Sequence, residues 1–182
     1  MNFCSNCGKP VRRAIPAGDH KPRFICDSCN TIHYENPRII VGCLPRWKDK
    51  VLLCKRAIDP GRGLWTLPAG FLENDETVEA GALRETLEEA NADVRIIRLF
   101  SLFSVPIVGQ VHLFFLASLN NLDFSPGKET TSLALFHKDE IPWNEIAFSS
   151  VRFTLDKYFL QAGGDGDRVY TGAFVDQIVR TK

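Results

Sequence analysis

Apolar runs along the chain predict several strands. Residues 38–45 (RIIVGCLP) and 50–56 (KVLLCKR) are joined by a short polar turn, a pattern typical of a β-hairpin. Three more strands are predicted at residues 94–104, 110–119 and 132–137. In the second of these, Val111, Leu113 and Phe115 alternate with His112 and Phe114, which indicates burial of at least one face.

Two amphipathic segments predict helices. Within residues 70–92 (GFLENDETVEAGALRETLEEANA), Glu88 and Glu89 lie within about 60° of Glu85 on a helical wheel. The opposite stripe is predicted to bury this helix against a core, and small residues to leave room beside the acids. The stripe is Ala80, Leu83, Leu87 and Ala90, and the small residues are Gly81 and Ala82. Residues 149–161 predict the second helix, with Val151, Leu155, Tyr158 and Phe159 on one side.

Strands interleaved with two helices predict a mixed α and β fold. The glycine-rich residues 163–167 and the tail after them are predicted to form a surface strand or a mobile end. The 182 residues have room for one domain and a small module, and a hydrophobic content of 45% is enough for a core. The formal net charge is zero, which does not favour bulk electrostatic attraction to nucleic acid or membranes. No apolar run is long enough for a membrane helix and no secretion signal is visible, so a cytoplasmic protein is expected.

Three carboxylates on one helix face predict a metal site. Like charges three and four residues apart repel by a few tenths of a kcal/mol per pair, which a divalent cation would relieve. Mg²⁺ or Mn²⁺ fits, because Mg²⁺ usually binds through carboxylates together with substrate phosphate oxygens. The alternative is that Glu85, Glu88 and Glu89 form a solvated helix face.

Four cysteines near the N-terminus predict a structural zinc site. Cys4 and Cys7 form one CxxC pair, and Cys26 and Cys29 form a second one eighteen residues later, the spacing of a zinc ribbon. Two disulfides are the alternative, which reducing conditions disfavour. Four thiolates close a tetrahedral site, so this zinc is expected to stabilise folding and not to bind substrate.

The Asn36-Pro37 dipeptide predicts the boundary between a ribbon at residues 1–35 and a main domain at 36–182. Positions 1–38 contain six basic residues and three acidic ones, and this small excess of positive charge does not favour nucleic-acid binding by the ribbon. We expect it to pack on the main domain or on a second subunit. His20 and His33 are interpreted as bystanders.

The spacing of the helix residues resembles the Nudix box, the signature of hydrolases that split nucleoside diphosphates linked to another group. Gly70 is followed after five residues by Glu76, after seven more by Arg84-Glu85, and after two more by Glu88-Glu89. Asn91 stands where the family has Gly, and Thr86 and Ala92 stand where larger aliphatic residues are usual. Asn also adopts the left-handed conformation at a helix end.

The resemblance implies an α/β/α sandwich with a mixed sheet and assigns roles within it. Glu85 and Glu89 would be the main metal ligands, the Gly70 carbonyl would complete the site, and Glu88 would be a ligand or the base. Glu129, just before a strand, would be a further ligand or the base. Glu76 and Arg84 would form a structural ion pair.

Substrate-binding residues are less defined. Arg56 ends a strand, where it either reaches a phosphate or solvates the strand end. Phe71 is a candidate for base stacking, together with three other aromatic residues, Trp65, Phe103 and Phe148.

A ribbon before the box is similar to two Nudix groups. One is the NADH pyrophosphatases, whose SQPWPFP motif is absent, since residues 101–110 read SLFSVPIVGQ. The other includes the plant plastid FAD and ADP-ribose pyrophosphatase, which the chain resembles in stretches such as VGCLP, VLLCKR and GLWTLPAG. The second resemblance implies Mg²⁺-dependent hydrolysis of FAD and ADP-ribose, commonly by a homodimer. The alternatives are an NADH or NAD pyrophosphatase, and a nucleic-acid or ligand-sensing module with an inactive Nudix domain.

Overall fold

The computed structural model describes residues 1–160 and 166–174. The chain divides into two compact units, Met1–Asn36 and Pro37–Lys182. Among the described helices, none is long and apolar enough to cross a membrane.

The first unit is a small antiparallel sheet. Its three strands are β1 (Arg12–Ala14), β2 (Arg23–Ile25) and β3 (Ile32–His33), with β2 in the centre. Its buried hydrophobic residues are two of the cysteines, Cys4 and Cys26. A segment with so small a core depends on another source of folding free energy, which a metal site can supply.

The second unit is built on one mixed sheet, in the order β10-β5-β4-β9-β8-β11. The central strands β4 and β9 are parallel, as are β8 and β11 at one edge, and the other pairs are antiparallel. The strands are β4 (Arg38–Trp47), β5 (Lys50–Arg56), β6 (Trp65–Thr66), β7 (Ala69–Phe71), β8 (Val94–Val105), β9 (Gln110–Leu119), β10 (Thr130–Phe136) and β11 (Tyr170–Ala173). Three 3₁₀ turns lie at Pro106–Val108, Lys138–Glu140 and Trp143–Glu145.

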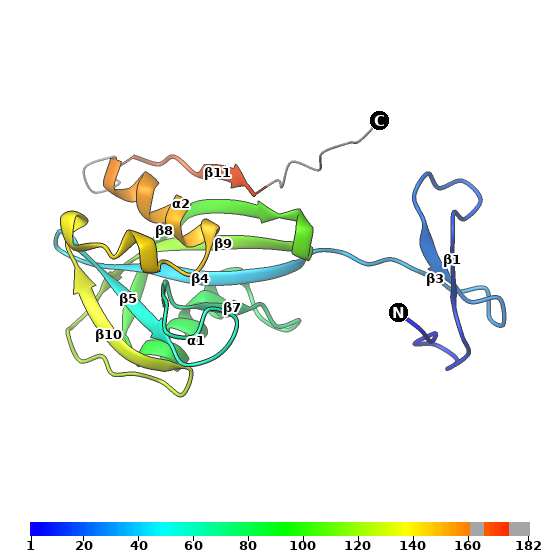
Figure 1. Cartoon of the computed structure of the whole chain (residues 1–182), viewed down its shortest axis with the longest axis horizontal. Helices are drawn as coiled ribbons and strands as arrows, with labels where there is room; N and C mark the ends of the chain where they lie inside the picture. Colours follow the sequence, from blue (N-terminus) through cyan, green and yellow to red (C-terminus); the bar gives the residue numbers. More distant parts are fainter. Residues whose placement is uncertain (161–165, 175–182) are drawn as a thin grey trace. The chain divides into compact units, whose positions relative to one another are not determined.

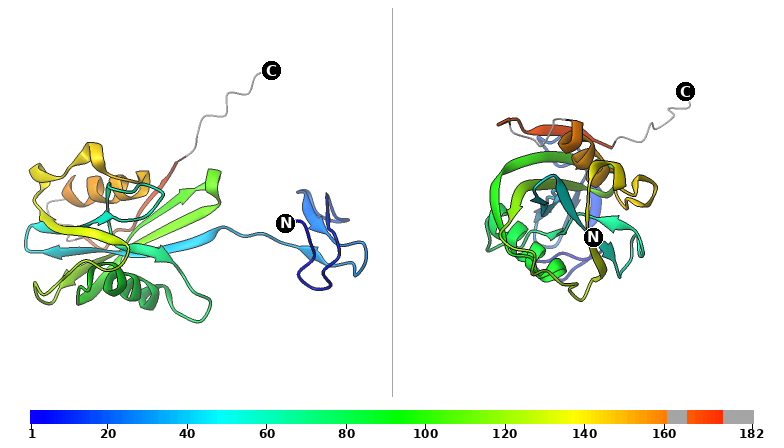
Figure 2. Two further views of the ribbon diagram at one scale, coloured as in Figure 1. Left: turned by 60° about the horizontal axis from the view of Figure 1, so that its bottom comes forward. Right: turned by 90° about the vertical axis from the view of Figure 1, so that its left-hand side faces the viewer.

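Two helices cover opposite faces of this sheet, α1 (Val78–Ala90) below and α2 (Ser149–Leu160) above in Figure 1. Alternate residues of the central strands feed two separate cores, since Leu44 and Phe114 lie on the α2 side and Cys43 and Phe115 on the α1 side. Figure 2 shows the same three layers from other directions. The predicted α/β/α sandwich with a mixed sheet, preceded by a small ribbon, is confirmed.

The face by which α1 packs differs from the prediction. The stripe was expected to be buried, but Leu83 and Leu87 are 39% and 56% exposed. The helix is buried through Gly81, Ala82, Thr86, Glu89 and Ala90. All of these except Glu89 are small, which lets the helix lie close to the sheet: a Cβ on Gly81 would lie 2.9 Å from Val41 Cγ2. The room expected beside the acids is therefore filled by the sheet, and the acids lie at the edge of that contact.

This packing predicts that Leu87→Gln changes stability little. Leu87 is on the solvent side of α1, and leucine and glutamine have similar helix propensities, so the free energy of unfolding should change by less than about 0.5 kcal/mol. Leu53→Ala, in the buried core, is the contrast and should cost about 2–5 kcal/mol. Urea denaturation measures both. A cost above about 2 kcal/mol for Leu87→Gln would contradict the observed packing.

Several predicted boundaries shift in the structure. The hairpin between β4 and β5 pairs only at Arg46–Val51 and Trp47–Lys50, because β4 continues alongside β9 and β7. The loop expected before the box contains β6 and β7, and the strand predicted at residues 132–137 begins at Thr130 and ends at Phe136. A surface strand exists at Tyr170–Ala173, whereas residue 161 and most of the predicted glycine-rich end lie outside the described residues.

Candidate active site and zinc site

Both ends of α1 are fixed by capping side chains. Thr77 accepts a hydrogen bond from the Ala80 amide at the N-terminus. At the C-terminus Asn91 adopts the left-handed conformation, with φ 45°, and its backbone N–H donates a hydrogen bond to the Leu87 carbonyl. Asn91 thus keeps the geometry expected for the glycine that it replaces. The side-chain Nδ2 also donates to the Ser125 carbonyl at 3.0 Å, a bond that glycine could not form.

Arg84 holds the acidic residues together. Its guanidinium binds Glu76 through two bonds, at 2.6 and 3.0 Å, and this pairing lowers the pKa of Glu76 to about 2. The predicted ion pair is therefore present. Arg84 Nη1 also contacts Glu85 Oε1 at 2.7 Å and Glu88 Oε2 at 3.2 Å, and Nη2 donates to the Phe71 carbonyl. The sequence did not indicate these extra contacts, which orient Glu85 and Glu88.

Each of the three box acids keeps one carboxylate oxygen without a hydrogen bond in the described structure. Arg84 occupies Glu85 Oε1 and Glu88 Oε2, and the Ala69 amide occupies Glu89 Oε2 at 3.0 Å. Among the described residues, only the four cysteines bring three or more ligand atoms within 4.8 Å of one another. The acids are thus spaced more widely than in a closed site. Ligand oxygens around one Mg²⁺ lie at most about 4.2 Å apart, so as placed one or two of these carboxylates would bind one ion, with waters and phosphate oxygens as its other ligands.

The turn before the helix approaches these carboxylates closely. A Cβ on Gly70 would overlap the Glu85 carboxylate, so a larger residue there would displace this carboxylate. The Glu89 side chain is buried, and this burial raises the pKa of Glu89 to about 7 despite the hydrogen bond from Ala69. Burial also raises the pKa of Glu85. Oxygen donors held in a partly dry, mutually repelling group are the donor set that a hard divalent cation stabilises.

A loop from a distant part of the chain closes over the end of α1. Amides of Ser125 and Gly127 donate to the carbonyls of Ala90 and Glu89, and the Ala57 amide donates to the Glu129 carbonyl. Glu129 is thereby placed near the box, and its charge contributes to the raised pKa values of Glu85 and Glu89.

This contact predicts that Gly127→Ala damages the site. A Cβ at residue 127 would overlap the Glu88 carbonyl, so the loop must move away from α1 and take Glu129 with it. We expect a loss of about 1–3 kcal/mol in stability and at least a tenfold fall in rate. Thermal melting and steady-state kinetics measure these effects. Ser125→Ala, which keeps the backbone bond, is the matched control, and normal rate in Gly127→Ala would refute the positioning role.

One cavity of about 900 Å³ gathers the predicted site residues. Its walls include the four predicted catalytic and metal-binding acids, the glycine whose carbonyl was predicted to bind metal, and the two predicted substrate-binding residues: Glu85, Glu88, Glu89, Glu129, Gly70, Arg56 and Phe71. Of the other aromatic candidates Phe148 lines the cavity. Phe103 is buried against Phe153, and Trp65 packs edge-on against Phe136.

Arg56 faces this cavity in a fixed position. Its guanidinium lies 5.1 Å from the Phe148 ring centre, and Nε donates to the Pro60 carbonyl at 2.8 Å. No hydrogen bond to the two terminal nitrogens is found among the described residues, and the charge of Arg56 acts on the Glu89 carboxylate. The position is that of an arginine able to bind a phosphate.

Other cavity-lining residues were not predicted, among them Gln110, His112, Phe114, Lys128 and Ser150. The pattern of strand 110–119 marked His112 as a polar residue in an apolar strand, but gave no sign that it faces a cavity. Only strand pairing shows which distant residues share that wall.

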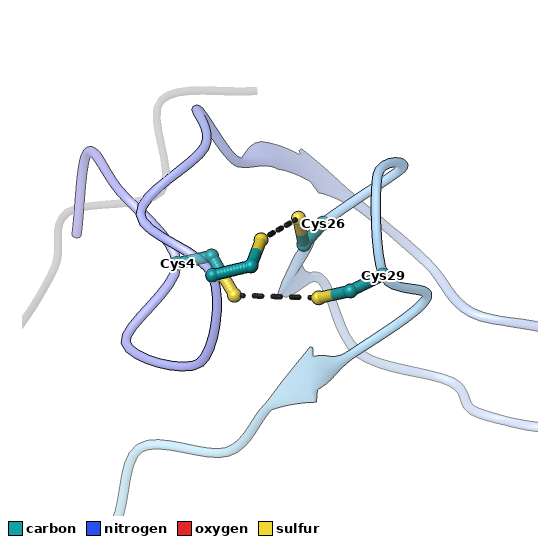
Figure 3. Close-up of side chains that lie close together, drawn as sticks. Cys4, Cys26 and Cys29 are labelled. Carbon is teal, nitrogen blue, oxygen red and sulfur yellow. Dashed lines mark hydrogen bonds between the residues drawn. The ribbon is translucent and has the colours of Figure 1, made fainter.

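The four cysteines form a single cluster, as predicted for zinc. Cys4 Sγ lies 3.6 Å from Cys29 Sγ, and Cys7 Sγ lies 3.5 Å from Cys26 Sγ (Figure 3). Four thiolates at zinc are about 3.8 Å apart in a regular tetrahedron, so the cluster fits the ion. All four cysteines are free of disulfides.

The surroundings of the cysteines differ within this cluster, since the pKa of Cys7 is raised by the neighbouring thiols whereas that of Cys29 is lowered. Hydrogen bonds from the Thr31 side chain and backbone lower the pKa of Cys29 to about 6. His33 Nε2 lies 3.3 Å from Cys4 Sγ, so this histidine supports a ligand.

Both units of the chain match known protein families. Residues 36–155 match the NUDIX domain family and residues 2–35 match the zinc-ribbon family described as Nudix N-terminal. A crystal structure of a NUDIX hydrolase from Nitrosomonas europaea is similar, with a TM-score of 0.91 and 52% identity over 96% of this chain and 99% of that one.

Two curated relatives carry more specific names. An NAD-capped RNA hydrolase NudC from Photobacterium profundum is 32% identical over 76% of this chain and 50% of its own length. An ADP-ribose pyrophosphatase from Methanocaldococcus jannaschii is 26% identical over 68% of this chain and 74% of its own length. The chain spans about half the length of the NudC relatives that it matches. The Nudix box, the fold and both family matches agree, so the chain belongs to the Nudix family. Its Nudix domain follows an N-terminal zinc ribbon.

Proposed function

We propose that this protein is a metal-dependent pyrophosphohydrolase that cleaves the diphosphate bridge of ADP derivatives. The observation that carries the proposal is a single cavity in which Glu85, Glu88 and Glu89 each keep a carboxylate oxygen free beside Arg56. Glu85, Glu88, Glu89 and the Gly70 carbonyl would hold Mg²⁺ or Mn²⁺, which when bound neutralises phosphate charge and activates water.

The chain's own residues divide the remaining work. Arg56 binds an oxygen of the diphosphate, and its contacts with Phe148 and Pro60 hold it in place. Glu85 and Glu89 are oriented by Arg84 and by the Ala69 amide. Glu88 and Glu129 are exposed, so they are the acids that can accept a proton from an attacking water. Water attacks one phosphorus, the bridging P–O bond breaks, and the two products each leave with a phosphate.

We further propose ADP-ribose and FAD as substrates, giving AMP with ribose 5-phosphate or FMN. The stretches of sequence that resemble the plant plastid group favour both, whereas the curated relatives named above are NudC and an ADP-ribose pyrophosphatase and do not include an FAD pyrophosphatase. The relatives' names refer to NAD-capped RNA and to ADP-ribose, and NAD itself contains an ADP-ribose unit. ADP-ribose is therefore the substrate on which the two lines of argument agree, and NAD or NADH is the alternative.

A substrate panel tests this proposal. The full chain is incubated with Mg²⁺ and ADP-ribose, FAD, NADH, NAD-capped RNA or nucleoside triphosphates, and the products are separated by chromatography. We expect AMP from ADP-ribose and from FAD. Turnover of NADH alone would favour the alternative, turnover of triphosphates alone would contradict the substrate class, and binding without turnover would identify a ligand sensor with an inactive domain.

A homodimer in the cytoplasm remains part of the proposal. The homodimer rests on the family resemblance. Light scattering of the full chain tests the dimer, and a monomer at micromolar concentration would contradict it.

A further inference from the structure

One row of side chains crosses three strands beneath the cavity. Ile40 of β4 is paired with Phe71 of β7 on one side and with His112 of β9 on the other. Paired residues in neighbouring strands point to the same face of a sheet. All three residues line the cavity, so this row faces it.

The neighbouring positions on the same face complete a flat surface. Gln110 and Phe114 stand two residues before and after His112 on β9, and both line the cavity. Phe114 is paired with Gly42, where a Cβ would overlap Ala69. Strand β4 therefore presents no side chain beside Phe114. We call Ile40, Phe71, Gln110, His112 and Phe114 the β4–β9 floor.

Hydrogen bonds fix the direction in which Gln110 faces. His112 is buried, and burial lowers the pKa of His112, so the ring is neutral at pH 7 and carries one N–H. His112 Nε2 lies 3.1 Å from Gln110 Oε1, an atom that can only accept, so Nε2 carries the proton. Nδ1 then accepts from the Ser150 hydroxyl at 2.8 Å. The Gln110 NH₂ group is left as a donor.

An exposed aromatic ring lies at one end of the floor. Phe71 is 44% exposed, and the Arg38 guanidinium lies 4.9 Å from its ring centre. An arginine stacked on a ring leaves one face of that ring for another flat group. Phe71 also adjoins the metal-site residues, since Gly70 precedes it and its own carbonyl accepts from Arg84.

We propose that the β4–β9 floor binds the heteroaromatic ring of one nucleotide half of the substrate, with Gln110 donating a hydrogen bond to a ring nitrogen or carbonyl oxygen. The inference rests on the proposed function, because it places the diphosphate at the acids in the same cavity. The β7 strand adjoins both regions, because its Ala69 amide donates to Glu89 and its Phe71 carbonyl accepts from Arg84. A diphosphate at the acids and a ring at Phe71 would therefore be neighbours in one cavity. We assign the adenine ring to the floor, and a flavin is the other source of the same chemistry.

The test measures product binding, which needs no turnover. Affinities of the full chain for AMP, FMN and ribose 5-phosphate are measured by calorimetry in wild type, Gln110→Glu and Phe71→Ala. Gln110→Glu keeps the oxygen that His112 binds and removes the NH₂ donor, but it also adds a negative charge, whose repulsion of phosphate is measured by the ribose 5-phosphate affinity. We expect about a tenfold loss of AMP affinity in Gln110→Glu and a loss of about fivefold or more in Phe71→Ala, with ribose 5-phosphate unchanged.

Val111→Ala is the control, because residue 111 is the neighbour of Gln110 that does not line the cavity. It should bind all three ligands like wild type, and melting temperatures verify that each variant is folded. A loss confined to FMN would overturn the adenine assignment. Unchanged affinity for both nucleotides, or an equal loss for ribose 5-phosphate, would overturn the floor as a ring-binding site.

The outcome is separable from the proposed function. If AMP binding weakens in Gln110→Glu but wild type hydrolyses none of the panel, the floor stands and the hydrolase proposal fails. If wild type hydrolyses ADP-ribose and both variants bind AMP normally, the hydrolase proposal stands and the floor fails.

Discussion

Replacing Glu89 by Gln should reduce hydrolysis by roughly a thousandfold or more while leaving the protein folded. Metal ions stabilise transition-state charge by several kcal/mol, and each 1.36 kcal/mol is a factor of ten in rate. Glu89 is buried at the cavity and its free oxygen is a proposed ligand. A neutral amide retains an oxygen for the bond from Ala69, but it is a much weaker ligand for a hard cation.

The stability of this variant should not fall. Burial raises the pKa of Glu89 above its unfolded value, to about 7, so without metal the folded state disfavours the charged form. The stability associated with the protonated group is present below the unfolded pKa near 4.5 and is lost as the pH rises to about 7. Gln carries no such loss, so at pH 8 the metal-free variant should melt at or above the temperature of wild type.

Glu79→Gln is the matched control for these measurements. Glu79 lies in the first turn of the same helix, is exposed and does not line the cavity, so this variant should keep the full rate. If Glu89→Gln also keeps the full rate, Glu89 does not belong to the catalytic site. A large fall in melting temperature would instead indicate a structural role.

Removing zinc should unfold residues 1–36 and leave the Nudix unit intact. The first unit buries little apart from two cysteines, and structural zinc sites supply about 10–16 kcal/mol of apparent binding free energy. The Nudix unit has two hydrophobic cores of its own. A zinc chelator should therefore make the ribbon sensitive to protease while the larger fragment resists cleavage.

Thiol labelling gives this experiment an internal control. The chain has six cysteines, of which Cys43 and Cys54 are buried in the Nudix core. After chelation Cys4, Cys7, Cys26 and Cys29 should react rapidly, and the other two only when the Nudix unit unfolds. Slow reaction of the first four cysteines after complete zinc removal would show that the ribbon folds without metal.

Local spacing explains why much of the site could be predicted from the sequence. The cysteines within each CxxC pair, and the acids of the box, are a few residues apart, so turn and helix geometry brings them close. The two CxxC pairs lie eighteen residues apart, and their meeting was predicted from the spacing of a zinc ribbon. The left-handed end at Asn91 is likewise a local property of its backbone. The same reasoning failed for the buried face of α1, because helix periodicity shows where apolar residues gather and cannot show that small residues allow closer packing.

Features that depend on strand register or on contacts with distant loops could not be predicted from local spacing. His112 and Phe71 lie in one row across the sheet only because each of them is paired with Ile40. Gly127 is unremarkable in the sequence, and its necessity follows from its contact with the Glu88 carbonyl. Arg84 was expected to bind Glu76, but its contacts with Glu85 and Glu88 depend on rotamers that the sequence does not specify.

Binding of Mn²⁺ to the Nudix unit tests the central claim most directly. Electron paramagnetic resonance of Mn²⁺ titrated into the zinc-loaded full chain, with wild type compared to Glu85→Gln, Glu89→Gln and the control Glu79→Gln, counts bound ions without any substrate. We predict that wild type and Glu79→Gln bind Mn²⁺ equally and that each of the other two variants binds it at least tenfold more weakly. Equal Mn²⁺ binding by all four proteins would show that the box acids do not hold the cation, and would contradict the proposed site.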